Sequence, residues 1–170
     1  MPSRLHNGET FPDLTIDVVG GQTLKLPSDL AGSYAVVLIY RGSWCPYCSA
    51  QLAAFARAQE RLGAAGVAIV AVSVDDEATS RALVEKLRLT FAVGYGASAP
   101  HVAMAVGAYV SDDGAYLQST GFVLDRNGRI LTAVYSSGAI GRLVPEDVLG
   151  FVKYVEAQRD NGLRAAVAAG

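Results

Sequence analysis

Two cysteines, Cys45 and Cys48, stand three residues apart in the segment YRGSWCPYCSAQ, residues 40–51. They are the only cysteines of the chain, and its only tryptophan, Trp44, comes directly before the first of them. On a helix, this spacing places both sulfurs on one face and within disulfide distance, which suits thiol redox chemistry. The same pair could instead supply two ligands to a metal ion, form a structural disulfide, or consist of two inert buried thiols.

The pair lies where a buried strand is expected to end and a helix to begin. Residues 34–40 are a continuous apolar run between glycines, which is typical of a strand buried on both faces. A helical pattern follows from Pro46, a residue that fits the first position of a helix. Cys45 would then lie at the helix N-terminus, where unpaired backbone N–H groups and the helix dipole lower the pKa of a thiol. Arg41, four residues earlier, could add a positive potential at the same sulfur.

Cys48 lies one turn further into this helix, and we expect it to be less exposed and less acidic than Cys45. The two residues therefore predict that Cys45 attacks an oxidant or a disulfide, and that Cys48 resolves the resulting sulfenate or mixed disulfide. An external reductant would return the electrons, so we expect no metal and no organic cofactor. Trp44 is a candidate wall of the active-site face, and Tyr47 a solvent-facing residue that could contact a partner.

The alternative roles for the cysteines are less well supported. A zinc site needs about four ligands, and beyond the two cysteines only His6 and His101 could serve, without ligand spacing. A structural disulfide is disfavoured in a reducing compartment and across so short a loop. Inert buried thiols are disfavoured because a strand-to-helix junction is a poor place to hide them.

Composition limits the class of protein. A chain of 170 residues with 51% hydrophobic and 18% charged residues is expected to form one globular domain, residues 1–170. A net charge of -2 without a Lys/Arg run argues against nucleic acid or an anionic membrane as partner, and the apolar runs are too short to span a bilayer. No signal-peptide pattern is visible at the N-terminus, so we expect a cytoplasmic protein.

The remaining pattern predicts an α/β fold. Buried strands that alternate with helices imply a mainly parallel centre, and a late hairpin adds antiparallel strands. The predicted elements are an N-terminal β-hairpin (14–18 and 23–26), strands 34–40, 67–74 and 91–95, hairpins 108–117 and 120–135, and helices from Pro46 to about Gly63, from caps at Asp75 and Asp76 to about Arg88, over 99–106 and from Pro145. The Ala-rich tail, residues 162–170, is expected to fray.

The segment WCPYC before a helix resembles the thioredoxin superfamily. A wider match resembles peroxiredoxin-like proteins of the alkyl hydroperoxide reductase/thiol-specific antioxidant family. It rests on these segments: GETFPDLTI (8–16), VVLIYRGSWCPYCSAQL (36–52), VAIVAVSVDD (67–76), GFVLDRNGRI (121–130) and GRLVPEDVL (141–149). This resemblance implies a thioredoxin-like fold with a central mixed sheet flanked by helices, Cys45 as peroxidatic and Cys48 as resolving cysteine. It also implies a hydroperoxide as oxidant, a small thiol or thioredoxin-like protein as reductant, and a homodimer as one expectation.

The chain departs from that family at three positions. Peroxiredoxins carry a Pro seven residues and a Thr three residues before the peroxidatic cysteine, and an Arg three residues before a later aromatic; here these positions hold Leu38, Gly42 and Ser119. The Thr and Arg side chains hold peroxide in that family. Arg41 or Arg142 is therefore the candidate for the missing cation, and Ser43 for the missing hydroxyl.

Two other functions stay open on the sequence alone. The Cys-Pro-Tyr-Cys motif also occurs in glutaredoxins, which favours a thiol–disulfide oxidoreductase acting on protein or glutathione-type disulfides. Thioredoxins, however, carry a buried Asp six residues before the first cysteine, where this chain has Ile39. A non-enzymatic redox sensor, whose surface changes with the state of the two thiols, is the third candidate.

Overall fold

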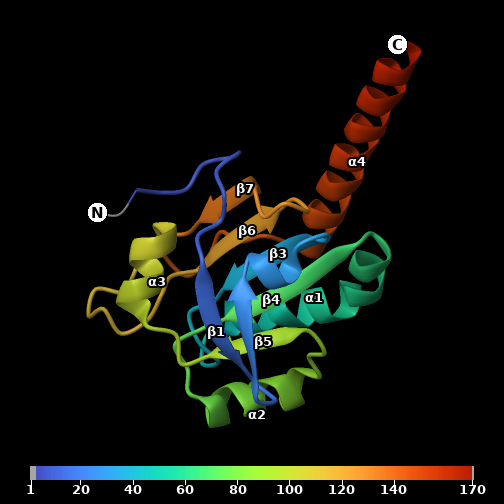
Figure 1. The fold of residues 1–170 in the computed structure, drawn as a ribbon. Helices are drawn as coiled ribbons and strands as arrows, with labels where there is room; N and C mark the ends of the chain where they lie inside the picture. The colour runs from blue at the N-terminus through green and yellow to red at the C-terminus, as the bar shows by residue number, and fades with distance from the viewer. Residues whose placement is uncertain (1–2, 170) are drawn as a thin grey trace.

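The computed structural model describes residues 3–169, and its centre is one seven-stranded mixed sheet (Figure 1). The strand order is β2-β1-β5-β4-β3-β6-β7. The strands are β1 (Leu14–Val18), β2 (Gln22–Leu26), β3 (Tyr34–Ile39), β4 (Val67–Val72), β5 (Ala92–Tyr95), β6 (Thr120–Leu124) and β7 (Ile130–Tyr135). β4 pairs in parallel with β3 and β5, and all other pairs are antiparallel. The predicted parallel centre with antiparallel additions is confirmed.

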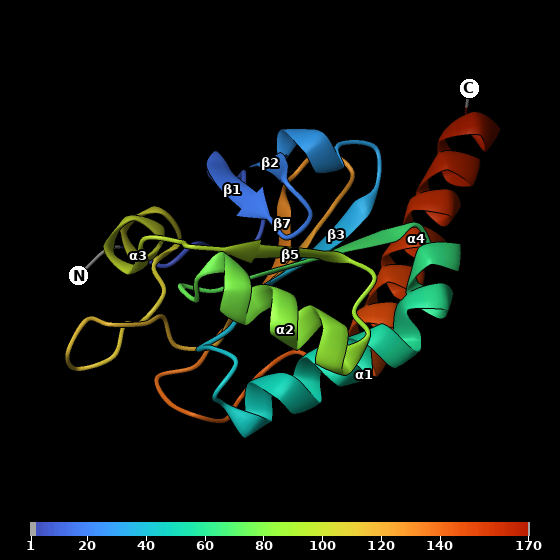
Figure 2. The same cartoon turned by 90° about the horizontal axis from the view of Figure 1, so that it is seen from below.

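Helices cover both faces of the sheet (Figure 2). They are α1 (Pro46–Ala64), α2 (Glu77–Leu87), α3 (Ala99–Val106) and α4 (Pro145–Ala168), with a short 3-10 helix at Ser28–Leu30. α1, α2 and α4 pack on one face, and α3 with the N-terminal segment packs on the other. The fold is thus the predicted mixed sheet flanked by helices, and β1 and β2 form the predicted N-terminal hairpin.

β3 is the central element because both of its faces are buried. Alternate side chains along a strand point to opposite faces, and Val36 and Leu38 pack with α1 while Val37 and Ile39 pack toward α3. All six residues of β3 are buried, as its continuous apolar run predicts. α1 presents Leu52 to the same core one turn after the cysteines. The strand and the helix therefore hold the thiols from two sides.

Residues 108–117 form a short, irregular hairpin loop, as predicted. One antiparallel bridge joins Val110 to Leu117, and the backbone amides of Ser111 and Gln118 donate to the carbonyls of Tyr116 and Tyr109. The two arms are too short to count as strands of the sheet. The loop brings Tyr116 to the side chain of Arg41.

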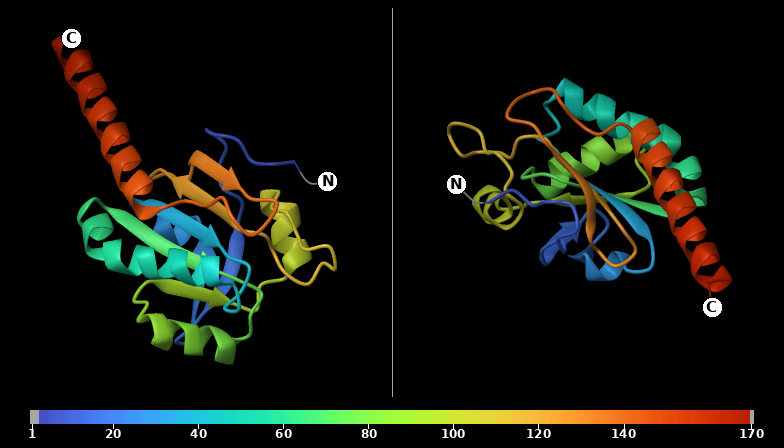
Figure 3. Two further views of the ribbon diagram at one scale, coloured as in Figure 1. Left: turned by 180° about the vertical axis from the view of Figure 1, so that it is seen from behind. Right: turned by 90° about the horizontal axis from the view of Figure 1, so that it is seen from above.

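The tail is helical as far as the described residues go. α4 continues to Ala168, and its second half projects away from the sheet (Figure 3). All side chains from Ala157 to Ala169 are exposed, so nothing in the domain packs on this part of the helix. Fraying of residues 162–170 stays a prediction, because an unsupported helix end is marginal in water. Within residues 3–169, no helix combines the length and the apolar character needed to cross a membrane.

We expect the end of α4 to contribute almost nothing to stability. A chain that ends at residue 161 should keep its free energy of unfolding within about 0.5 kcal/mol, because only exposed side chains are removed. Leu149→Ala on the same helix should lose about 2 kcal/mol or more, because it leaves a cavity in the core. Urea denaturation measures both. A large loss on truncation would show that the tail packs against something.

Candidate active site

The two thiols lie at the junction of β3 and α1, as predicted. Cys45 is the residue that caps the N-terminus of α1, Pro46 occupies the first helical position, and both cysteines are free thiols. The amide of Ser49 donates to the carbonyl of Cys45, which closes the first helical turn and brings Cys48 over Cys45. The backbone amide of Cys48, in the first turn of the helix, reaches the thiol of Cys45.

The guanidinium of Arg41 lies against the first thiol. Its Nη1 is 3.8 Å from Cys45 Sγ. Burial opposes ionisation of Cys45, but the thiol and amide of Cys48 and the charge of Arg41 outweigh it, so the pKa of Cys45 is lowered. Cys45 is thus the more easily ionised thiol, in agreement with the expectation from its place at the helix N-terminus.

The second thiol has an arginine of its own. Cys48 Sγ accepts hydrogen bonds from the backbone N–H of Arg41 and from Arg142 Nη1, both at 3.4 Å. Burial and the contact with Cys45 nevertheless raise the pKa of Cys48, because these two effects outweigh the donors. The expected order of acidity, with Cys45 below Cys48, agrees with these contacts.

The expectation that Cys45 is the exposed thiol is wrong. Both Cys45 and Cys48 have 0% of their surface exposed. Arg41, which contacts the first thiol, lies 4.8 Å from the ring centre of Trp44 and 5.2 Å from that of Tyr116. The two rings meet edge to face at 5.0 Å, and Arg41 Nη2 donates to the Tyr116 hydroxyl at 3.0 Å. We call Arg41, Trp44 and Tyr116 the cover.

Tyr116 is a site residue that sequence reasoning missed. It comes from the irregular loop before β6 and is separated from Arg41 by 75 positions in the chain. Its only signal in the sequence was its place in a segment that interrupts the strand pattern. Tyr47 is 52% exposed, as its solvent-facing expectation required, and Trp44 is 55% exposed.

Gly42 stands where peroxiredoxins carry a Thr, and the structure shows why a larger residue does not fit there. Its φ is 153°, and a Cβ there would lie 2.4 Å from Trp44 Nε1. The indole thus occupies the space beside residue 42, and a Thr side chain could not fit there without displacing it. Ser119, at the position of the family's Arg, is buried and its carbonyl pairs with the amide of Ser136. Arg41 is the cation that reaches Cys45.

The acidic pair after β4 has two separate roles. Asp76 caps α2 by accepting from the amide of Thr79 at 2.8 Å, as predicted. Asp75 is not a helix cap, because its carboxylate accepts from the amide of Ser43 at 2.7 Å and so holds the loop before Cys45. Ser43 contributes this backbone contact, and among the described residues its hydroxyl makes no hydrogen bond to either cysteine.

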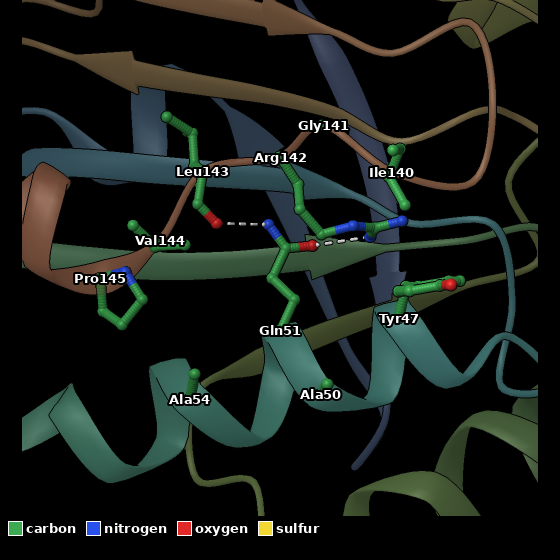
Figure 4. A pocket seen from close by; sticks show the side chains of 10 residues that line it. All are labelled: Tyr47, Ala50, Gln51, Ala54, Ile140, Gly141, Arg142, Leu143, Val144 and Pro145. Carbon is green, nitrogen blue, oxygen red and sulfur yellow. Dashed lines mark hydrogen bonds between the residues drawn. The ribbon is translucent and has the colours of Figure 1, made fainter.

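A groove of about 300 Å³ lies between α1 and the loop that leads into α4 (Figure 4). Gln51 and Arg142 meet inside it, as the sticks show, with Arg142 Nη1 donating to Gln51 Oε1 at 3.1 Å. Gln51 Nε2 donates to the carbonyl of Leu143 at 2.9 Å, and Arg142 Nη2 to that of Ala139 at 2.6 Å. Arg142 is therefore held by the loop between β7 and α4 and by the cysteine-bearing helix.

Metal-ligating residues do not gather in residues 3–169, where no group of three or more His, Cys, Asp or Glu could hold an ion. His6 and His101 are both exposed on the surface. The chemistry open to the site is that of two thiols, one of them acidic, with one arginine each.

Comparison with known proteins identifies the family. The sequence profile described as the AhpC/TSA family matches residues 7–133. The chain belongs to this family. A peroxiredoxin of Treponema denticola is 25% identical over 158 residues, covering 91% of this chain and 75% of that protein. A chloroplastic peroxiredoxin Q of Populus jackii is 33% identical over 89 residues, covering 52% of this chain and 41% of that one.

The AhpC/TSA chain also shares its fold with solved structures. Mycobacterium tuberculosis AhpC superposes with a TM-score of 0.78 at 19% identity, covering 92% of this chain and 96% of that chain. The predicted fold, family and enzyme class, a thiol-based peroxidase of the antioxidant type, are thereby confirmed. The roles of the individual site residues stay predictions.

We expect the cover to control the acidity of Cys45. Arg41→Met should raise the pKa of Cys45, because it removes the positive charge at the sulfur. Tyr116→Phe should raise it less, because the charge remains but loses its hydrogen bond. Ultraviolet titration of the thiolate in a Cys48→Ser background measures both. Arg57→Met, which removes an exposed charge of α1, is the matched control.

The order of these effects is the discriminating result. Because Cys45 reacts as a thiolate, a raised pKa shifts its reactivity to higher pH, and the loss is greatest on the acid side. Titration curves of the Arg41 and Arg57 variants that coincide would contradict the role given to Arg41.

We expect Gly42 to be intolerant of a side chain. Gly42→Ala should lose about 1–3 kcal/mol of unfolding free energy, because the methyl group collides with the indole of Trp44. It should also change the fluorescence of Trp44. Gly63→Ala should instead gain about 0.5 kcal/mol, because a Cβ there meets nothing and Ala favours a helix. If the two variants had equal free energies of unfolding, the contact between the indole of Trp44 and Gly42 would not constrain the residue at position 42.

Proposed function

We propose that this protein reduces hydroperoxides with Cys45 as nucleophile and Cys48 as resolving thiol. The observation that carries the proposal is the acidic thiol at the N-terminus of α1, with Arg41 against it and a second thiol one turn away. The family and its peroxiredoxin-named relatives support a peroxide as oxidant.

The first step consumes the peroxide. The Cys45 thiolate attacks one peroxide oxygen, the O–O bond breaks, and the second oxygen leaves as water or an alcohol once it is protonated. Cys45 becomes a sulfenic acid. Negative charge spreads onto the peroxide oxygens as the bond breaks, and the fixed guanidinium of Arg41 is placed to stabilise it.

The second step forms the disulfide. Cys48 Sγ attacks the sulfur of the Cys45 sulfenic acid, and the sulfenic oxygen leaves as water with the proton of Cys48. The two residues are one helical turn apart, so their sulfurs can bond with little movement of the helix. Two thiol equivalents from a small thiol or a thioredoxin-like protein then restore both thiols. A cytoplasmic location and a homodimer remain predictions.

Access to Cys45 requires the cover to move. A thiol with 0% exposure meets neither water nor peroxide, so the side chains that contact it must shift before the first step. Trp44 is 55% exposed and contacts both Arg41 and Tyr116, so its movement would loosen the cover. The indole therefore also reports on the reaction through its fluorescence.

The test follows single turnovers. Reduced protein mixed with hydrogen peroxide should change the fluorescence of Trp44 and lose both free thiols without gaining oxygen. At pH 7, Cys45 should react roughly tenfold or more faster than an ordinary thiol, which is only a few per cent thiolate there. Cys45→Ser should abolish the reaction. Cys48→Ser should still react but stop at the sulfenic acid, which dimedone labels.

Two results would overturn the proposal. A Cys45 that reacts with peroxide no faster than free cysteine would remove the peroxidase function. A wild-type protein that accumulates sulfenic acid as Cys48→Ser does would remove Cys48 from the resolving role. Mass spectrometry of the peptide that holds both cysteines distinguishes disulfide from sulfenic acid.

A second candidate is a thiol–disulfide oxidoreductase on the same residues. The observation in its favour is the apolar surface that exposed Trp44 and Tyr47 offer to a partner beside the cysteines. Protein disulfides are bulkier than peroxides, however, and both thiols are fully buried. Turnover in an insulin reduction assay, without rapid reaction with peroxide, would favour this candidate.

A further inference from the structure

Arg142 makes a contact that the proposed peroxide step does not use. Its Nη1 lies 3.4 Å from Cys48 Sγ, whereas Cys45 has Arg41 as its partner. A neutral thiol gains little from an arginine, but a thiolate in a buried site gains much. The contact therefore matters most in a step in which Cys48 carries negative charge.

Gln51 fixes the position of Arg142. Its side chain is only 7% exposed, and it accepts from Arg142 Nη1 while it donates to the carbonyl of Leu143. Arg142 also donates to the carbonyl of Ala139, so its guanidinium is held at three points, Cys48 included. Gln51 follows Cys48 by three residues on α1, and both side chains thus face the same loop.

A disulfide between the cysteines can open in two directions. A reductant thiolate attacks one sulfur in line with the S–S bond, and the other sulfur leaves as a thiolate, faster when that thiolate is better stabilised. Cys45 lies at the N-terminal end of α1, while Cys48 lies one turn into the helix, where its Sγ contacts Arg142. Attack at Cys45 makes Cys48 the leaving group although its pKa is the higher of the two, so this direction needs the charge of Arg142 at Cys48.

We propose that Arg142, positioned by Gln51, stabilises the Cys48 thiolate that leaves when the reductant opens the Cys45–Cys48 disulfide. The reductant sulfur bonds to Cys45 Sγ, the S–S bond breaks, and its electron pair goes to Cys48 Sγ beside Arg142. A second reductant thiol then attacks the mixed disulfide and releases Cys45. The inference rests on the proposed function, because it needs the disulfide to form.

The experiment measures reduction alone. Diamide oxidises the protein to the disulfide without peroxide, and dithiothreitol then reduces it while the fluorescence of Trp44 is followed. Arg142→Met should slow this reduction roughly three- to tenfold, because a poorer leaving group lowers the rate. Arg142→Lys, which keeps the charge, should recover part of it. Arg57→Met should match the wild type.

Comparison with Arg41→Met assigns the leaving group. If Cys48 leaves, the Arg142 variant is the slower of the two in reduction. If Cys45 leaves, the Arg41 variant is slower, and the proposal is wrong. A reduction rate of Arg142→Met equal to that of the wild type also overturns it.

A second measurement does not depend on the disulfide. In a Cys45→Ser background, Arg142→Met should raise the pKa of Cys48 and Arg57→Met should leave it unchanged. An unchanged pKa in the Arg142 variant contradicts the proposal even if that variant is reduced slowly, since slow reduction would then reflect altered packing. Circular dichroism of each variant confirms that it is folded.

Gln51 is tested as a positioning residue by a double-mutant cycle. Gln51→Met alone should slow reduction of the disulfide. Added to Arg142→Met, it should slow reduction little further, because Gln51 acts through the arginine. Additive effects would assign Gln51 a separate, structural role. If treatment with diamide forms no Cys45–Cys48 disulfide in the wild type, both the resolving role of Cys48 and this inference are wrong. If the disulfide forms with diamide but not with peroxide, only the proposed peroxidase function is wrong.

Discussion

The stabilisation of charge on two buried sulfurs is the constraint on which the rest of this structure depends. Both thiols are excluded from solvent, and burial by itself opposes the thiolate that thiol chemistry needs. Two positively charged side chains oppose this effect, Arg41 at Cys45 and Arg142 at Cys48. The helix N-terminus adds its unpaired N–H groups. The stability of each thiolate therefore depends on how firmly the two arginines and the helix N-terminus are held in place.

Different parts of the fold hold the two arginines. Arg41 directly follows β3, so the central strand sets its backbone, and the rings of the cover set its side chain. Arg142 comes from the loop before α4 and depends on Gln51 of α1. The absence of a side chain at Gly42 lets the indole of Trp44 pack close to the backbone. A site that lacks the usual Thr and Arg of peroxiredoxins thus has a different set of contacts around the same cysteine position.

Local patterns in the sequence were sufficient to predict most elements. The apolar run of β3 and the helical spacing after Pro46 located the strand-to-helix junction, because burial on both faces and helix periodicity leave strong signals. Two expectations failed for one reason. The exposure of Cys45 and the capping role of Asp75 both depend on what the rest of the chain places beside them.

The sequence by itself determined the cysteine pair and its place at a helix N-terminus. These follow from neighbours within one or two helical turns, whose geometry is fixed by backbone hydrogen bonding. Only the tertiary structure decided which cation serves which sulfur and what covers the site. Those contacts join residues that are 75 and 94 positions apart, Arg41 with Tyr116 and Cys48 with Arg142, and no local spacing encodes such an encounter.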